Sequence, residues 1–278
     1  MTSTVTQQPI RPTVTPRFSG MKVTQGRVIK SEWTKFRSLR STLITLVVSV
    51  ILTIGLGTLI SAVTASHWSQ SSPGDRADFN AVVTSLDGIR FSQLAVGVLG
   101  VLLISGEYAT GMIRASLTAV PKRLPVLWAK LSVFTGVVGI ISIISTFIAF
   151  FLGQAMLSSQ HLQVTISSPD ALRMVAGAGI YVLLVGLIGM ALGGLMRNTA
   201  AGISSLVALF FVIPPVLNLL PKSWANNIGP YLPSNAGESF WGHPNGVHLS
   251  ALAGLLVLCG WTAAAIAAAA VRLKSQDA

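Results

Sequence analysis

Charged residues and cysteine are both scarce in this sequence. Only 10% of its 278 residues are Asp, Glu, Lys or Arg, whereas 51% are hydrophobic, and the mean hydropathy is +0.70. Because charged residues make up about a quarter of an ordinary soluble domain, this composition excludes one and indicates an integral membrane protein. The single cysteine, Cys259, has no partner in the chain, which excludes an intramolecular disulfide and a metal cluster built from cysteines. We interpret Cys259 as a small buried hydrophobic residue.

Signatures of common catalytic sites are absent too. The sequence has no His-Glu-x-x-His pair and no Gly-x-Ser-x-Gly turn, so an intramembrane zinc or serine protease lacks its parts. It has no Gly-x-x-x-x-Gly-Lys-Ser/Thr phosphate loop, so we expect no ATP hydrolysis by this chain itself. The histidines have irregular spacing, and we interpret them as loop residues rather than metal ligands: His67, His161, His243 and His248. We therefore expect no catalytic residue, metal or cofactor in this chain.

Six apolar stretches are long enough to cross a membrane, which takes about 20 residues in a helix. They cover residues 43–64, 91–112, 131–157, 174–196, 199–220 and 249–271. The second stretch is irregular, because only 16 uncharged residues lie between Arg90 and Glu107. It reaches the required length only if it continues past Glu107, so we place Glu107 at or just inside one membrane boundary. The predicted fold is an all-α integral membrane protein with six transmembrane helices.

The basic residues are distributed very unevenly between the two sides of this predicted bundle. Eight Lys and Arg residues precede the first span, four lie between spans two and three, one lies between spans four and five, and two follow the last span. Because positively charged loops stay in the cytoplasm, we predict that both termini and the loop after span two are cytoplasmic. The net charge of +11 is then a topology signal, and we expect no nucleic-acid partner.

Two different segments precede the first span. Residues 1–23 are rich in Thr and Pro and have no periodicity, which predicts a disordered cytoplasmic tail. Residues 24–40 instead place apolar side chains at i, i+4 and i+7: Ile29, Trp33 and Phe36. Basic side chains are expected on the opposite face: Lys30, Lys35 and Arg37. This pattern predicts an amphipathic helix in the headgroup plane. An ordinary basic flank of a membrane helix is the alternative, but it leaves the apolar stripe unexplained.

The loop after span two has a similar pattern, within the segment GEYATGMIRASLTAVPKR (residues 106–123). Its apolar side chains recur at i, i+4 and i+7: Ile113, Leu117 and Val120. Gly111 and Pro121 are expected to bracket a short amphipathic helix at the cytoplasmic face. A simple connector with stop-transfer charges is the alternative, although a connector needs no apolar stripe.

This loop carries a family resemblance. Its pattern Gly-Glu-Tyr-x-x-Gly-x-x-Arg-x-x-Leu-x-x-x-Pro-x-Arg resembles the signature of the permease subunits of type-2 ABC exporters. SEWTKFRSLRS at 31–41 resembles their N-terminal elbow helix, and PYLPSNAGE at 230–238 resembles the segment before their last helix. The resemblance covers residues 24–275, which would form one permease domain. Many members have Thr where this chain has Met112, which is a departure from the pattern.

The resemblance implies a mechanism and partners. In this family the loop after span two is a coupling helix that docks on a separate ATPase subunit, which uses ATP and Mg²⁺, and two permease copies form the pathway in the bacterial cell membrane. Apolar contact with the ATPase would come from Ile113, Leu117 and Val120, and a charged rim from Arg114, Lys122 and Arg123. We expect Glu107 to anchor the membrane edge by pairing with an elbow residue such as Lys35 or Arg37.

Other features and functions remain open at this point. Gly189 and Gly193 have the spacing of closely packed membrane helices, and Pro214 and Pro215 predict a kink or an end in the fifth span. A lipid-acting enzyme would need a polar cluster, which only the segment 221–248 offers through Glu238 and His243. A membrane scaffold or sensor that transports nothing is the third possibility. The few polar residues in the spans favour a hydrophobic or amphipathic cargo.

Overall fold

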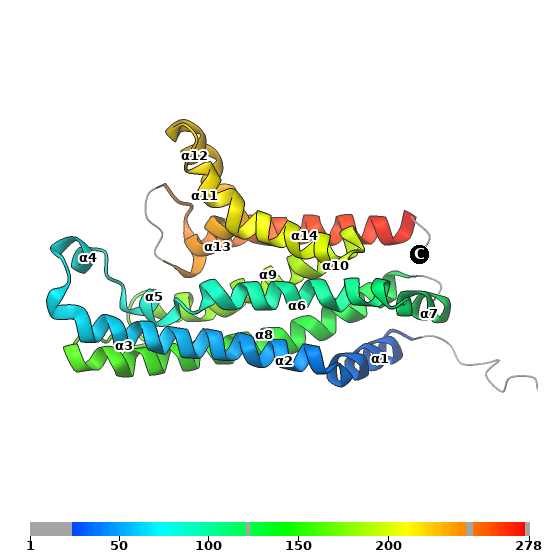
Figure 1. The fold of residues 1–278 in the computed structure, drawn as a ribbon, viewed down its shortest axis with the longest axis horizontal. Coiled ribbons are helices and arrows are strands. Elements are labelled where there is room, and N and C mark those ends of the chain that lie inside the picture. Colours follow the sequence, from blue (N-terminus) through cyan, green and yellow to red (C-terminus); the bar gives the residue numbers. More distant parts are fainter. Residues whose placement is uncertain (1–23, 121–122, 243–246, 276–278) are drawn as a thin grey trace, which may run out of the picture.

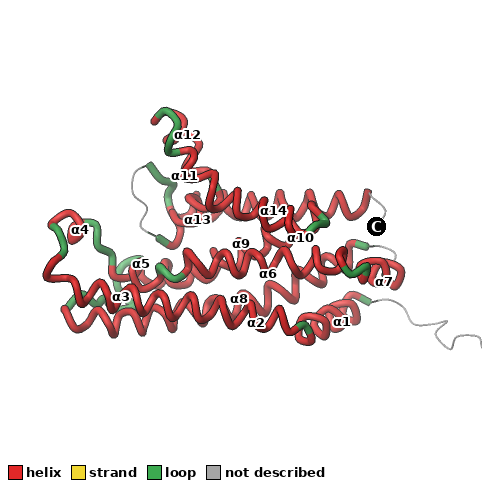
Figure 2. The backbone as a smooth tube through the Cα atoms, in the orientation of Figure 1, coloured by secondary structure: helices red, strands yellow, loops and turns green. Residues whose placement is uncertain are grey.

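The computed structural model describes residues 24–120, 123–242 and 247–275, and this part of the chain is helical without strands (Figures 1 and 2). Six of its helical segments are long and apolar enough to cross a membrane. They are Arg40–Gln70, Ala81–Ala109, Leu124–Gln160, Ala171–Met196, Thr199–Leu217 and Ala251–Ser275. The protein is therefore a multi-pass membrane protein, as its composition predicts.

Two of the six spans are interrupted by a π-helical turn. The first consists of α2 (Arg40–Ile51), a π turn (Leu52–Leu56) and α3 (Gly57–His67), and the fifth of α10 (Thr199–Val207), a π turn (Ala208–Val212) and α11 (Ile213–Leu217). The other spans contain α5 (Ala81–Leu86) with α6 (Ile89–Ala109), α8 (Leu124–Leu157), α9 (Ala171–Met196) and α14 (Ala251–Ser275). The shorter helices are α1 (Gln25–Ser38), α4 (Pro73–Ala77), α7 (Met112–Ala119), α12 (Lys222–Ile228) and α13 (Pro233–Trp241).

The second span begins at Ala81, ten residues before its predicted start at 91, because it is built from two helices. Asp87 and Arg90 lie where α5 meets α6, and these charges ended the apolar stretch that the sequence shows. Both charges are paired: Arg90 Nε is 3.0 Å from Asp87 Oδ1, and Arg90 Nη2 is 2.8 Å from Glu238 Oε1. Gly88 lies between them, where a Cβ atom would be only 2.4 Å from the carbonyl oxygen of Leu52. The span therefore continues past charges that satisfy one another.

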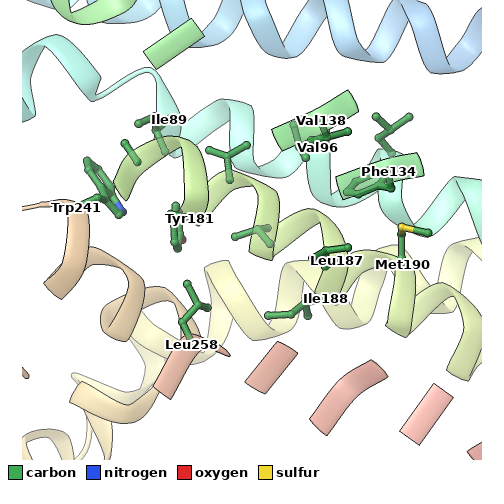
Figure 3. Packing of buried hydrophobic residues seen from close by; sticks show 14 of the residues in the cluster. Ile89, Val96, Phe134, Val138, Tyr181, Leu187, Ile188, Met190, Trp241 and Leu258 are labelled. Atoms are coloured by element: carbon green, nitrogen blue, oxygen red, sulfur yellow. The ribbon is translucent and has the colours of Figure 1, made fainter. Parts of the chain in front are cut away.

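The centre of the molecule is the contact between α6 and α9, where glycines let two helices approach closely. A Cβ atom on Gly189 would be 2.2 Å from the carbonyl oxygen of Gly97, and one on Gly193 would be 2.6 Å from that of Val101. The close packing predicted from the Gly189–Gly193 spacing is thus confirmed. Figure 3 shows the surrounding core, in which side chains from α6, α8 and α9 meet: Val96, Phe134, Val138, Ile188 and Met190.

Pro214 and Pro215 lie within the fifth span, which continues past them to Leu217. A π turn precedes Pro214 and Pro215, which lie at the start of α11, where a missing N–H costs little. From α11 onwards the chain leaves the packed helices, and α11 and α12 project from them (Figure 1). Two short helices, α12 and α13, lie within the segment 221–248.

Cys259 is exposed, and its predicted burial is wrong. α14 packs on the rest of the chain through one narrow stripe: Gly254, Leu258, Thr262 and Ala269. Cys259 directly follows Leu258 of this stripe. Because successive residues of a helix point about 100° apart, the Cys259 side chain points away from the stripe. The opposite face of α14 is apolar and exposed at Leu252 and Leu256. In a membrane this face therefore meets lipid or another chain. The sequence alone does not show this, because a helix face that meets lipid is as apolar as one buried in a protein core.

The helices α1 and α7 lie at one end of the molecule, close to the end of α14, and α4 lies at the opposite end (Figure 1). The last turn of α6 and the first turn of α8 flank α7 in the chain, because α7 connects them. The described parts of the segments that carry the family resemblance, residues 31–41 and 106–120, thus lie at the same end. The predicted tail 1–23 and residues Pro121 and Lys122 lie outside the described residues.

Candidate functional site

Four charged side chains from three helices meet at this end of the molecule. Glu32 and Lys35 come from α1, Glu107 from the last turn of α6, and Lys130 from the beginning of α8. Lys130 Nζ lies 2.6 Å from Glu32 Oε2 and 2.7 Å from Glu107 Oε1. Lys35 Nζ lies 2.7 Å from Glu32 Oε1 and 3.1 Å from Glu107 Oε1. We call these residues the four-charge cluster, in which every charge has two partners of opposite sign.

The four-charge cluster is largely shielded from solvent. The side chains of Glu32, Glu107 and Lys130 are at most 9% exposed, and that of Lys35 is 25% exposed. A buried charge costs several kcal/mol unless opposite charges and hydrogen bonds compensate it. Two lysines and two glutamates provide this compensation here, and the cluster as a whole is neutral. Its charges therefore depend on one another.

The pKa of Lys35 reflects this dependence. Burial by itself lowers the pKa, but the hydrogen bond to Glu32 and the charges of Glu107 and Glu32 outweigh burial, so the pKa lies above its ordinary value of 10.5. A lysine with a raised pKa in the folded state contributes stability that is complete below the unfolded-state pKa and is lost as pH rises through the folded-state pKa. The contribution of Lys35 is therefore constant through the neutral range and disappears only in strongly alkaline solution.

Packing of α1 on α8 brings Glu32 and Lys130 together. Val28 is buried in a small cluster with Val126 and Ala129, and Gln25 Nε2 donates a hydrogen bond to the carbonyl oxygen of Pro125 at 3.1 Å. α1 ends at Ser38, and the extended backbone of Leu39 separates it from the first span. The two helices thus hold Glu32 and Lys130 against each other although the residues are far apart in the sequence.

The buried stripe of α1 is rotated relative to the predicted one. Phe36 is buried and Ile29 is partly buried, as expected, but Trp33 is exposed and Glu32 takes the inward position. Lys35 was expected to point away with Lys30 and Arg37, and it instead joins the four-charge cluster. Because Glu32 is paired on both oxygens, an acidic side chain occupies a position that the pattern reserves for an apolar one.

The pairing of Glu107 with an elbow residue was expected, and the partner is Lys35 rather than Arg37. α6 extends through Glu107 to Ala109, and Gly111 follows with a left-handed φ of 73°. This turn starts α7, the short helix predicted after Gly111. Lys35 Nζ also donates to Ser116 Oγ of α7 at 3.0 Å. α7 is therefore tied directly to α1, and through the four-charge cluster to α6 and α8.

The two described side chains of the predicted α7 stripe, Ile113 and Val120, face their own chain. Ile113 is 6% exposed and lies near Tyr108 and Leu127, and Val120 packs against the Val28 cluster. Met112 is exposed instead. An amphipathic helix at the end of a bundle buries its apolar side in this way. The side chains of Arg114 and Leu117 lie outside the described residues. Arg123 contacts the end of α14, where its Nη1 is 3.4 Å from the carbonyl oxygen of Leu273.

Sequence reasoning did not predict the pairing of three residues at this end. Glu32 and Lys130 complete the four-charge cluster, and Arg197 at the end of α9 lies over the ring of Tyr108 at 5.2 Å from its centroid. A local signal existed only for Glu32, which is three residues from Lys35 and therefore on the same helical face. Lys130 and Arg197 are brought in by tertiary packing, for which the sequence contains no periodic signal.

A cavity of about 220 Å³ adjoins the four-charge cluster. Its charged end includes Lys35, Glu107 and Lys130, and its other walls are mainly apolar, with Leu99 of α6 and Met190 of α9 among them. Glu107 Oε1 accepts both lysines, whereas Oε2 is buried and has no hydrogen-bond partner among the described residues. The cavity thus combines mainly apolar walls with one charged end.

The left-handed turn at Gly111 gives a testable prediction. Gly111→Ala is expected to lower the free energy of unfolding by about 1–2 kcal/mol, because a side chain disfavours this conformation. Denaturant unfolding followed by circular dichroism measures the change. Gly26→Ala is the matched control: Gly26 is helical, a Cβ atom there meets nothing within 4 Å, and its replacement is expected to cost nothing. Equal stability of the two variants would contradict the role of the turn.

At the end of the molecule opposite the four-charge cluster, a second set of polar side chains lines a cavity of about 350 Å³. Glu238 is held there by Arg90, and Tyr181 donates a hydrogen bond to Gln93. Glu238 was the acidic residue considered for a lipid-acting enzyme, and its suggested partner His243 lies outside the described residues. Among the residues that the structure describes, no group of three or more His, Cys, Asp or Glu side chains could hold a metal ion. The described residues of this end therefore form an ion pair between Arg90 and Glu238.

Neither a protein-family model nor a curated protein matches this chain in sequence. The function therefore has to be inferred from its residues and their geometry.

Proposed function

We propose that this protein is the membrane-spanning permease subunit of a type-2 ABC exporter. Two copies, or this chain and a homologous permease, would form the pathway in a bacterial cell membrane, and a separate subunit would hydrolyse ATP. The observation that carries the proposal is the attachment of α7 to α1 and to spans two and three through Ser116 and the four-charge cluster. A short helix fixed in this way has the connections that a coupling helix needs.

The connections of α7 suggest how a partner's movement would reach the spans. A push on α7 acts on Lys35 through Ser116, and Lys35 is bonded to Glu107 at the end of span two. Lys130 links the same carboxylate to the start of span three. α1, α7 and the adjoining ends of α6 and α8 would therefore move as one rigid body, which is how small shifts at an interface become larger movements of helices.

The surface of α7 also bears on the proposal. Because Ile113 and Val120 pack against their own chain, contact with the ATPase would come from the outer face of α7, where Met112 is exposed. The resemblance assigns the charged rim of this contact to Arg114, Lys122 and Arg123. The apolar stripe would then seat α7 on the bundle, and the opposite face would meet the partner.

The position of α1 supports its assignment as an interfacial elbow helix. Trp33, Lys30 and Arg37 are all exposed on α1, and amphipathic aromatic and basic side chains favour the headgroup level. The basic ends of α1 and α14 lie at the same end of the molecule (Figure 1), which would be the cytoplasmic one under the positive-inside rule.

Cysteine protection tests the coupling helix. Cys259 is exposed, so it is first replaced by alanine, and a single cysteine is then placed at Met112. In open membrane fragments, a maleimide is expected to label Met112→Cys in the chain alone, and coexpression with its ATPase subunit is expected to reduce this labelling. Asp78→Cys, at an exposed position near α4 at the opposite end, is the matched control and should be labelled equally in both samples.

The outcome separates the proposed permease from a scaffold or sensor. A permease complex should copurify, protect Met112→Cys and hydrolyse ATP at a rate that changes with added cargo. If the subunits copurify but Met112→Cys and Asp78→Cys are labelled equally with and without the ATPase, α7 is not the docking element. A complex that protects α7 but whose hydrolysis no compound alters would point to a sensor.

A further inference from the structure

The cavity beside the four-charge cluster is long and mainly apolar. It follows α6 from Glu107 to Leu99, and eight residues of a helix extend about 12 Å. Its other walls include three buried side chains: Phe36, Val133 and Met190. The volume is about 220 Å³, whereas a cavity of about 150 Å³ lined by Leu, Ile and Phe already holds benzene. The cavity is therefore large enough for an apolar group bigger than a benzene ring.

The charges at the end of the cavity already balance one another. Lys35 Nζ donates to Glu32 Oε1 at 2.7 Å and to Glu107 Oε1 at 3.1 Å. Its third hydrogen bond goes to Ser116 Oγ at 3.0 Å, so every hydrogen of this ammonium group is used. Lys130 Nζ contacts the same two carboxylates. An added cation would be repelled by two ammonium groups and an added anion by two carboxylates, so this end favours an uncharged ligand.

One polar side chain of the cavity has no partner. Thr42 of α2 lines the cavity and is only 3% exposed. Its hydroxyl forms no hydrogen bond with another described residue, and unlike Glu107 Oε2 its oxygen is not completely enclosed. A helical threonine often donates to the carbonyl four residues earlier, as Thr45 does to Ser41 at 2.9 Å. Because α2 begins at Arg40, the carbonyl four residues before Thr42 belongs to α1 instead.

The rim of the cavity lies beside an apolar surface. Leu39 and Met112 are part of the rim, and both are exposed. Leu43 and Val47 continue this exposed apolar surface along α2, which is the beginning of the first span. A molecule dissolved in the adjoining leaflet would therefore reach the cavity without crossing a polar surface.

We propose that this cavity binds an uncharged amphiphile with a hydroxyl at one end, which pairs with Thr42 Oγ1 while the apolar chain extends toward Leu99. A hydroxyl both donates and accepts, so it satisfies the Thr42 hydroxyl in either direction. A buried hydroxyl without a partner is costly, and an apolar cavity with one polar group selects a ligand of the same pattern. The proposal does not depend on the chain being a permease, because binding requires neither ATP nor a second subunit.

Photolabelling of the full-length protein in phosphatidylcholine nanodiscs tests this site. The probe is a long-chain alkanol with a diazirine near its hydroxyl, and labelled peptides are identified by mass spectrometry. We expect labels at the start of α2 and in the last turns of α6. Dodecanol is expected to compete at about a three- to tenfold lower membrane concentration than dodecane, the effect of one additional hydrogen bond. Equal competition by the two compounds would overturn the hydroxyl site.

Charged competitors test whether the ligand is uncharged. Dodecylammonium and dodecanoate have the same chain as dodecanol, and both are expected to compete less well, because the four-charge cluster holds repelling groups of each sign. Competition by either compound that equals or exceeds that of dodecanol, at the same membrane concentration, would overturn this part of the proposal.

A threonine pair locates the hydrogen bond. Thr42→Val replaces the hydroxyl by a methyl group of similar size and should abolish the preference for dodecanol over dodecane. Thr45→Val is the matched control, because Thr45 lies in the same helix, bonds to its own backbone and has no part in the cavity. It should keep the preference of the parent. An unchanged preference in Thr42→Val would show that Thr42 does not bind the ligand.

A glycine pair locates the chain. Gly106 lines the cavity, and a Cβ atom there meets nothing within 4 Å, so Gly106→Leu should fill the cavity and remove most of the competed labelling. Gly136→Leu, at an exposed helical glycine with the same free space but no part in the cavity, should be labelled like the parent. Equal labelling of the two leucine variants would overturn the site.

The natural source of the amphiphile is identified by changing the lipid. If diacylglycerol in place of part of the phosphatidylcholine displaces the probe, the occupant is a neutral lipid of the leaflet. If only dodecanol displaces it, the occupant is a separate single-chain compound. Both results support a hydroxyl site and differ in its natural ligand.

Discussion

Lys130→Met is expected to lower the free energy of unfolding by roughly 3–5 kcal/mol, the usual cost of breaking a buried ion pair. Lys130 Nζ contacts Glu32 at 2.6 Å and Glu107 at 2.7 Å, and its side chain is only 9% exposed. Methionine keeps the length and apolar stem of lysine but removes the charge. Both carboxylates would then share Lys35 alone and remain largely buried. Denaturant unfolding in mild detergent, followed by circular dichroism, measures the loss.

Three further variants show whether the loss arises from unpaired charge. Lys35→Met should cost less than Lys130→Met, because the Lys35 side chain is 25% exposed and water can replace part of its contribution. Glu107→Gln combined with Lys130→Met removes one charge of each sign and should recover part of the stability. Lys30→Met removes an exposed charge from the same end and should change little. If Lys130→Met were no more destabilising than Lys30→Met, the four-charge cluster would not stabilise the fold.

Gly189→Ala is expected to cost about 3 kcal/mol, at the upper end of the range for one added group in a packed interior. The added Cβ atom would lie 2.2 Å from the carbonyl oxygen of Gly97, so α6 and α9 would have to separate. A flexible side chain could move aside, but the contacted atom belongs to the backbone. The same unfolding measurement reports the change, and reduced yield of folded protein from membranes accompanies it.

A second glycine distinguishes this contact from the general effect of glycine in a helix. Gly136→Ala changes an exposed residue of α8 where a Cβ atom meets nothing within 4 Å. Alanine favours helix over glycine by up to about 1 kcal/mol, so this control should be neutral or slightly more stable. Stability of Gly189→Ala equal to that of Gly136→Ala would show that α6 and α9 tolerate separation at this point.

The spans and the turn at Gly111 could be predicted because their signals are local. Length and hydropathy identify a membrane helix without knowledge of its neighbours, and all six predicted spans overlap helices of that kind in the described chain. Glycine at position 111 likewise marks a turn by its own conformational freedom. The start of the second span was misjudged because Asp87 and Arg90 interrupt the hydropathy, and their pairing is visible only in three dimensions.

The composition of the four-charge cluster could be predicted only in part. The excess of basic residues near Glu107 made a lysine partner a reasonable expectation, and Lys35 is one. Glu32 was overlooked because the helical pattern assigns inward positions to apolar residues, and Lys130 because nothing local connects it with α1. The inward turn of Lys35 has the same origin, since two carboxylates draw its charge toward the interior. Long-range pairing of charges leaves no periodic trace in a sequence.

The order in which the chain is made gives the four-charge cluster a further consequence. Glu32 and Lys35 are synthesised first and pair within one turn of α1, at 2.7 Å, so this pair needs no other segment. Glu107 then emerges at the end of span two, where an ionised carboxylate opposes entry into lipid. Its more buried partner, Lys130, is made 23 residues later. Until Lys130 is made, Glu107 can pair only with the more exposed Lys35, so we expect spans two and three to be completed as a pair.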